Sequence, residues 1–275
     1  MHVSTHFSVD NYFSMSASST VLLSTPPNEL NVVKRHLKTL DSEIDIPVSS
    51  ILQRAEEYGH IATNDSHAVI ISSFTKVGES QYLTTCGSSV ATITTDLTID
   101  SIEPADESLF NSSRSTIIQD LSPLLSTYSN EYYKNGHFTI VNLDEKPLTI
   151  VFSCGNLNSA SGYSSNFFAH YTLSDDLSSI SPHILPYVHL FESGNVHVTG
   201  SKPRTESFVT LSETSAQGVL NFIKKYEVDY LSSISELWEE LNEKVLKSFR
   251  RKLPVFRKKI EWTNIMALRM QIPRK

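Results

Sequence analysis

The residues with the clearest chemical potential are basic side chains near the end of the chain. They fall at Lys247, Arg250, Arg251, Arg257 and Lys259, and Trp262 follows them. Residues 241–275 hold eleven lysines and arginines against two glutamates, a net charge of +9, whereas residues 1–240 hold 12 basic and 28 acidic groups, a net of −16. Guanidinium groups pair well with carboxylates and phosphates, and tryptophan supplies a large apolar surface. The tail therefore has the composition of a surface that binds an anionic partner.

The tail divides into two parts at Pro254, which cannot continue a helix. Before it, Lys247 lies roughly 200° around a helix from the apolar Val245, so the basic residues that follow should share its outward face. Beyond it, four apolar residues have the spacing of one face of a short helix. They are Trp262, Ile265, Met266 and Met270. This amphipathic extension, residues 254–275, should order only on binding, because a short helix is marginal alone in water.

Other residue types give weaker signals for chemistry. The chain has no GxSxG, Walker loop, HExxH or glycine-rich dinucleotide turn, and only nine glycines, so no enzyme and no cofactor is expected. His189 and His197 lie close on a predicted hairpin with Glu192 at its turn, but histidines on a sheet face are a commoner arrangement than a metal site. Cys86 and Cys154 lie outside any CxxC pattern and are expected to be buried free thiols.

The elements that would position the tail follow from hydrophobic periodicity. The expected helices cover residues 30–37, 48–58, 115–133 and 215–253. The expected strands cover residues 69–74, 81–85, 89–99, 137–142, 148–154, 184–191, 195–200 and 208–211, with a loop over residues 155–165. Gly136 is expected to close the third helix with a positive φ. The last helix would be about 55 Å long, so it must lie across a broad sheet or a partner.

This order of elements predicts an α+β fold with N-terminal helices, a small β-rich middle, and an antiparallel sheet crossed by one long C-terminal helix. Residues 1–23 are expected to be a disordered extension, residues 24–253 the folded body, and residues 254–275 the C-terminal extension. The apolar runs are too short to span a bilayer, and residues 1–20 have no basic or apolar signal regions. The chain is therefore expected in the cytoplasm.

Three interpretations of the tail remain open from charge alone. It could be a solvated terminal helix, a segment for nuclear localisation or nucleic-acid binding, or a segment that binds anionic phosphoinositides. The acidic body offers no extended basic surface to follow a nucleic-acid backbone, so nucleic acid is not the expected partner.

The tail also resembles a known family. Residues 246–262, LKSFRRKLPVFRKKIEW, strongly resemble the C-terminal signature of the alpha subunit of F-actin capping protein, approximately FKxLRRxLPVTRxKIDW. Residues 188–196, VHLFESGNV, resemble the VHYYEDGNV hairpin of that family, and residues 24–29, STPPNE, resemble its SPPGE helix entry. With a weaker match at residues 133–136, the resemblance spans about residues 24–269.

The resemblance implies an alpha subunit that pairs with a beta subunit through a shared antiparallel sheet crossed by long helices. Such a dimer caps the barbed end of the actin filament, blocks subunit addition and loss there, needs no calcium, nucleotide or metal, and does not sever filaments. It implies actin contacts for Lys247, Arg250, Arg251, Arg257 and Lys259, and an apolar tether that begins at Trp262 and includes Ile265, Met266 and Met270.

The chain also departs from the family pattern. The tryptophan-rich NFWNGxWRSxW segment should fall near residues 157–167, where only Tyr163, Ser165 and Phe167 are equivalent. Phe256 replaces the threonine of LPVTR, and Pro273 interrupts any helix in the extension after Ile272. This divergence leaves open a homodimer or an altered pairing with a beta subunit.

Overall fold

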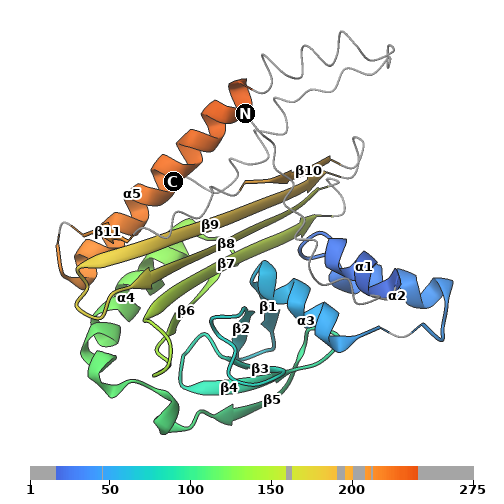
Figure 1. Ribbon diagram of the computed structural model, residues 1–275, viewed down its shortest axis with the longest axis horizontal. Helices are drawn as coiled ribbons and strands as arrows, with labels where there is room; N and C mark the ends of the chain where they lie inside the picture. Colours follow the sequence, from blue (N-terminus) through green and yellow to red (C-terminus); the bar gives the residue numbers. More distant parts are fainter. Residues whose placement is uncertain are drawn as a thin grey trace, which may run out of the picture.

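A computed structural model of the chain describes residues 17–44, 46–158, 163–190, 196–200, 208–211 and 213–240. These residues build a main antiparallel sheet with two helices on one face and a smaller helical and β-rich part on the other (Figure 1). The predicted α+β class is confirmed. Among the described helices, none is both long and apolar enough to cross a membrane.

The N-terminal part contains three helices, α1 (Ala17–Ser24), α2 (Leu30–Leu40) and α3 (Val48–Glu57). The predictions of α2 and α3 are confirmed. α1 begins inside the extension that was expected to be disordered, and that boundary is wrong because Leu22 is fully buried in the same core cluster as Ile51 and Leu52 of α3. Residues 1–16 lie outside the described residues.

Five short strands follow in two small sheets. β1 (His60–Thr63) pairs with β2 (Ala68–Ile71), and β3 (Gln81–Leu83), β4 (Ser89–Ile93) and β5 (Ile99–Pro104) form an antiparallel meander. The single strand expected over residues 89–99 is wrong. A turn that places Leu97 at a φ of 57° separates β4 from β5, so the two segments pair with each other instead of running on.

The main sheet has the strand order β10-β9-β8-β7-β6, and β11 also pairs with β9. Its strands are β6 (His137–Val141), β7 (Thr149–Asn158), β8 (Tyr163–Leu173), β9 (Ser179–Leu190), β10 (Val196–Thr199) and β11 (Val209–Thr210). The strands predicted on the two sides of residues 142–148 and in the 184–200 hairpin are confirmed, although β7 and β9 are longer than expected.

The loop expected over residues 155–165 is wrong in its described part. β7 continues to Asn158 and β8 begins at Tyr163, and the two strands pair along their whole length. Ser164, inside the expected loop, and Asn166, just after it, instead donate hydrogen bonds to backbone carbonyls of the N-terminal part. Such polar residues interrupt the alternation of polar and apolar side chains by which a strand is recognised in a sequence.

Two helices, α4 (Ser115–Tyr132) and α5 (Ala216–Glu240), cover the opposite face of the main sheet (Figure 1). Two 3-10 turns, Glu107–Leu109 and Ser112–Arg114, precede α4. The positive φ after α4 falls at Asn135, with a φ of 59°, and not at Gly136 as expected. α5 confirms the first part of the long predicted helix, and residues 241–253 lie outside the described residues.

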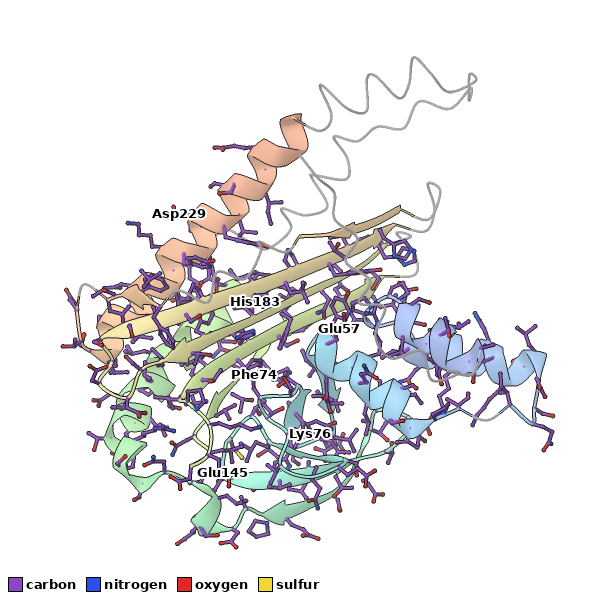
Figure 2. The ribbon with its side chains drawn as sticks, viewed as in Figure 1. Glu57, Phe74, Lys76, Glu145, His183 and Asp229 are labelled. Atoms are coloured by element: carbon purple, nitrogen blue, oxygen red, sulfur yellow. The ribbon has the colours of Figure 1, made fainter. Side chains whose placement is uncertain are left out.

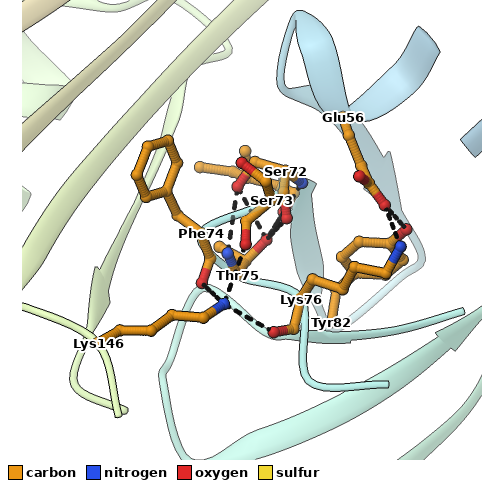
Figure 3. A network of polar contacts seen from close by, with 9 residues as sticks. Glu56, Ser72, Ser73, Phe74, Thr75, Lys76, Tyr82 and Lys146 are labelled. Atoms are coloured by element: carbon orange, nitrogen blue, oxygen red, sulfur yellow. Dashed lines mark hydrogen bonds and ion pairs between the residues drawn. The ribbon is translucent and has the colours of Figure 1, made fainter. Parts of the chain in front are cut away.

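A lysine ties the small β-rich part to the main sheet. The Nζ of Lys146, in the turn between β6 and β7, donates to the carbonyls of Ser73, Phe74 and Lys76 at 3.0, 3.1 and 3.0 Å (Figure 3). These three acceptors satisfy all three ammonium donors. Burial lowers the pKa of Lys146. Nearby, Glu56 of α3 pairs with Lys76 at 2.8 Å and accepts the Tyr82 hydroxyl at 2.7 Å.

One half-buried histidine should make stability depend on pH. Burial lowers the pKa of His60, at the start of β1, to about 4. Between pH 6.5 and 4 the unfolded chain therefore binds a proton that the folded chain does not, and the free energy of unfolding falls as the pH falls through this window. We expect His60 to account for a loss of about 1–2 kcal/mol between pH 7 and pH 5.

Urea denaturation of the full chain at both pH values tests this expectation. His60→Gln should lose less stability than the wild type between pH 7 and pH 5, whereas the control His67→Gln, at an exposed position, should follow the wild type. Equal losses in the wild type and His60→Gln would contradict the assignment.

Candidate functional site

The predicted binding residues themselves follow the last described residue, Glu240. Those outside the described residues are Lys247, Arg250, Arg251, Arg257, Lys259, Trp262, Ile265, Met266 and Met270. What the structure does describe is the helix that leads to them, the edge of the sheet beside it, and a junction that joins two of the recognised sequence segments. Each of these constrains how the tail and a partner can be placed.

Helix α5 lies on the main sheet through an apolar face. Val219, Leu220, Ile223 and Tyr230 are buried in the same core cluster as Phe152 and Ile184 of the sheet. The opposite face of α5 carries exposed residues such as Lys225, Val228 and Asp229, and Figure 2 shows Asp229 on the outer side of the helix. The expectation that the long helix lies across a broad sheet is confirmed for Ala216–Glu240.

The outer edge of β10 is open among the described residues. The N–H of Gly200 donates to the carbonyl of Pro186 at 3.2 Å, so these two residues form a hydrogen-bonded pair. Hydrogen-bonded and non-hydrogen-bonded pairs alternate in an antiparallel ladder. The backbone groups of Thr199, opposite Tyr187, therefore point away from β9, and Thr199 is exposed. This edge can accept another strand.

The edge of β9 between β10 and β11 is closed to such pairing. The same alternation directs the backbone groups of residues 182, 184 and 186 outward, and two of these residues are Pro182 and Pro186, which have no N–H. Of the outward carbonyls, that of Pro186 accepts the N–H of Gly200 and that of Ile184 accepts the Tyr230 hydroxyl of α5 at 3.3 Å. That hydroxyl also reaches the Gly200 carbonyl at 2.8 Å. On this side of the main sheet, β10 thus offers a better edge than the neighbouring stretch of β9.

Two sequence segments that lie 160 residues apart meet at the N-terminal junction. Glu29 accepts a hydrogen bond from Nδ1 of His189 at 2.6 Å, which joins the STPPNE segment to the hairpin segment. Asn28 donates to the Ser165 carbonyl at 2.9 Å, and Ser164 donates to the Pro27 carbonyl at 3.1 Å. Arg54 of α3 donates to the Thr25 carbonyl at 2.7 Å. The entry to α2 is therefore held against the sheet mainly by hydrogen bonds.

The structure describes the histidine pair on the hairpin, whereas Glu192 at its turn lies outside the described residues. The rings of His189 and His197 stack with centroids 4.3 Å apart, and the hydroxyl of Tyr187 bonds to Nδ1 of His197. Burial, with the nearby His189, lowers the pKa of His197. Among the described residues, no three metal-ligating side chains gather in one place. Cys86 is exposed and Cys154 is half-buried, so the expectation of two buried thiols is wrong.

Comparisons with known proteins cover nearly the whole chain. The family described as F-actin capping protein alpha subunit matches residues 18–272. The F-actin-capping protein subunit alpha of Emericella nidulans is 24% identical over 261 residues, which are 92% of this chain and 94% of the relative. That of Candida albicans is 26% identical over 257 residues, 88% of this chain and 90% of the relative.

A third relative and a solved structure extend the comparison. The F-actin-capping protein subunit alpha of Debaryomyces hansenii is 33% identical over 144 residues, 52% of each chain. The solved homodimeric actin capping protein alpha subunit from Plasmodium berghei has a similar fold, with a TM-score of 0.61 and 17% sequence identity over 87% of this chain and 96% of that chain.

Proposed function

Because this chain belongs to the family of F-actin capping protein alpha subunits, we propose that it caps the barbed ends of actin filaments as one subunit of a dimer. The family is one of actin-binding proteins and not of enzymes. Capping would block subunit addition and loss, without calcium and without severing. The protein would act in the cytoplasm, at the actin cytoskeleton. The observation that carries the proposal is the family match over residues 18–272, which includes the basic signature.

The basic tail would supply the actin contacts. Lys247, Arg250, Arg251, Arg257 and Lys259 match the basic positions of the family signature, and the apolar residues after Trp262 would serve as a tether. The tail has a net charge of +9, so it would bind acidic surfaces on the terminal actin subunits. Under this proposal, the folded body begins with α1 at Ala17 and runs to residue 253, and residues 254–275 form the extension that orders on the filament.

The partner subunit would add its strand to the outer edge of β10. That edge is open at Thr199, whereas the neighbouring stretch of β9 is closed by Pro182 and Pro186. A beta subunit is the proposed partner, and a second copy of this chain is the alternative, since the Plasmodium berghei alpha subunit is homodimeric. Light scattering on the chain alone, and with a beta subunit, separates the two.

Loss of two tail charges is expected to weaken capping strongly. Each arginine can make charge-assisted hydrogen bonds worth about 1.5–3 kcal/mol, so Arg250→Ala together with Arg251→Ala should weaken barbed-end binding on the order of 100-fold. The measurement is pyrene-actin elongation from filament seeds, with the complete dimer titrated in the presence of EGTA and then of calcium. Filament microscopy under both conditions scores severing.

A matched control removes two exposed charges from the body. Lys38→Ala with Lys225→Ala makes the same change in net charge outside the tail and should leave capping unchanged. If the arginine variant caps as well as the wild type, the assignment of the tail is wrong. If the wild-type dimer fails to slow elongation, the proposed function is wrong. If the wild-type dimer requires calcium, only the proposed calcium independence is wrong. If it breaks filaments, only the proposed absence of severing is wrong.

Nucleic acid and phosphoinositides receive no support as partners from these comparisons. The salt dependence of binding to duplex DNA tests the nucleic-acid alternative. Co-sedimentation with vesicles that contain or lack anionic lipid tests the phosphoinositide alternative. Binding to either at physiological ionic strength, together with absent capping, would favour the alternative over the proposal.

A further inference from the structure

A carboxylate lies within the apolar contact between α5 and the main sheet. Glu227 of α5 is 7% exposed, and its two oxygens accept hydrogen bonds from three tyrosine hydroxyls. Tyr128 of α4 donates to Oε2 at 2.6 Å, and Tyr133, just after α4, donates to the same oxygen. Tyr171 of β8 donates to Oε1 at 2.6 Å. We call these four residues the Glu227 cluster.

The tyrosine rings of the Glu227 cluster bury its hydrogen bonds away from solvent. Tyr171 is fully buried, Tyr128 is 3% exposed and Tyr133 is 9% exposed. Tyr128 and Tyr171 pack edge-on against Phe152, and Tyr133 stacks on the same ring. On the outer side, Nζ of Lys224 lies 5.4 Å from the ring centroid of Tyr128. The three hydrogen bonds are therefore formed in an apolar environment, where directional polar contacts are strong.

The protonation states fit this arrangement. Burial, followed by the neighbouring Glu227 charge, raises the pKa of Tyr133 and Tyr171 well above 10, so both hydroxyls keep the protons they donate. Burial raises the pKa of Glu227, and the three tyrosine hydrogen bonds act in the opposite direction. An ionised carboxylate accepts only, so it suits three donors better than a protonated one, which carries a donor of its own.

An apolar residue at this position would continue the buried face of α5 at less desolvation cost. Buried ionic groups often contribute little net stability compared with well-packed apolar replacements, and in some proteins they instead fix one geometry among several. The apolar contacts of Val219, Leu220 and Ile223 with the sheet are not directional. By contrast, the Glu227 cluster joins three separate elements, α4, β8 and α5, through bonds that tolerate little rotation or sliding.

We propose that the Glu227 cluster fixes the rotation and tilt of α5 on the sheet, and that Glu227 is a positioning residue for actin capping because α5 carries the basic tail. This inference rests on the proposed function. α5 extends 13 residues beyond Glu227, about 20 Å at 1.5 Å per residue. A tilt of about 10° at Glu227 would move the end of this segment by about 3 Å, enough to misplace a charged contact.

The test separates geometry from stability. The fourfold variant Glu227→Leu, Tyr128→Phe, Tyr133→Phe and Tyr171→Phe removes every polar atom of the cluster and keeps its apolar bulk, so the folded dimer should have a melting temperature close to or above that of the wild type. We expect the same variant to bind barbed ends at least tenfold more weakly in the seeded elongation assay. Amide exchange over residues 228–240 should be at least tenfold faster.

Two further variants keep the outcome decisive. Glu236→Gln removes an exposed carboxylate from the same helix and should leave both capping and exchange unchanged. If the fourfold variant does not fold, Glu227→Gln is measured by the same criteria. Wild-type capping by a folded cluster variant, or unchanged exchange over residues 228–240, would overturn this inference alone. Absence of capping by the wild-type dimer would overturn the proposed function instead.

Discussion

Replacing Thr199 with proline is expected to separate this chain from its partner subunit while the sheet itself stays folded. The N–H of Thr199 points to the outer side of β10, because Gly200 and Pro186 form the neighbouring hydrogen-bonded pair. Proline removes that outward donor and places its ring where a partner strand would lie. Proline is tolerated at edge positions whose N–H faces solvent, so the pairing of β10 with β9 should survive.

The expected effect on dimer formation is large. The lost hydrogen bond costs about 1 kcal/mol and the overpacking by the proline ring about 1–3 kcal/mol, which together correspond to on the order of 100-fold in the dissociation constant. The measurement is titration of a labelled beta subunit, with light scattering on the chain alone to detect a homodimer. Thr199→Val keeps the N–H and the side-chain shape and serves as the control.

Two results would distinguish the alternatives for this edge. Weaker pairing for Thr199→Pro but not for Thr199→Val would place the partner strand along β10. Unchanged pairing for both variants would show that the partner contacts another surface, and the shared-sheet proposal would then be wrong. A loss of folding in the isolated Thr199→Pro chain would contradict the strand alternation from which its outward N–H is deduced.

Four of the described helices, α2 to α5, could be predicted from sequence because each has one apolar face. α3 and α4 begin at the expected residues, Val48 and Ser115, and end within one residue of the expected positions. α1 gave no such signal. Only eight residues long, it has serines at two of its buried positions, Ser18 and Ser19, and depends on contacts with α3 that are distant in sequence.

The polar strands of the main sheet could not be predicted in the same way. In β8, Ser164, Asn166 and His170 are buried, so the strand shows no alternation of polar and apolar residues. Ser164 and Asn166 bind carbonyls of the N-terminal part, and the sequence gives no indication that those carbonyls lie opposite. Side chains that satisfy a distant backbone are recognisable only once the two segments are placed together.

Some residues of the candidate site could be predicted from sequence and others could not. Its basic residues could be predicted from their charge and from the spacing around Pro254, and they stay a prediction because they lie outside the described residues. Glu227 could not, although one signal was present. It lies four residues after Ile223 and three before Tyr230, on the face that α5 buries, where a charged residue needs a partner. Its tyrosines come from α4 and β8, and no local pattern connects them.

Introducing a side chain at Gly59 is expected to be the most destabilising single change at the junction of the N-terminal part and the sheet. Gly59 follows α3 with a φ of 61°, a conformation that costs other residues about 1 kcal/mol or more. A Cβ built there would lie 2.1 Å from Cδ2 of Phe168, a buried ring of β8. Its carbonyl also accepts the Ser153 hydroxyl of β7, so the backbone cannot withdraw freely.

We therefore expect Gly59→Ala to lower the free energy of unfolding by about 3 kcal/mol or more, the sum of the backbone cost and the overpacking of Phe168. Gly87→Ala is the matched control, since Gly87 has a φ of 72° but the nearest atom to its Cβ would be 3.7 Å away. It should cost only about 1 kcal/mol. Urea denaturation of both variants measures the difference.

Phe168→Leu tests whether the ring of Phe168 causes this loss of stability, because a smaller side chain relieves the contact with an alanine at position 59. The double variant Gly59→Ala with Phe168→Leu should lose less stability than the two single losses added together, since the residues touch. Strict additivity, or equal losses for Gly59→Ala and Gly87→Ala, would show that the ring can move aside. The contact matters beyond stability, because Gly59 adjoins Tyr58, whose carbonyl binds Asn166 at 2.7 Å. A shift there would weaken this hydrogen bond between the N-terminal part and β8.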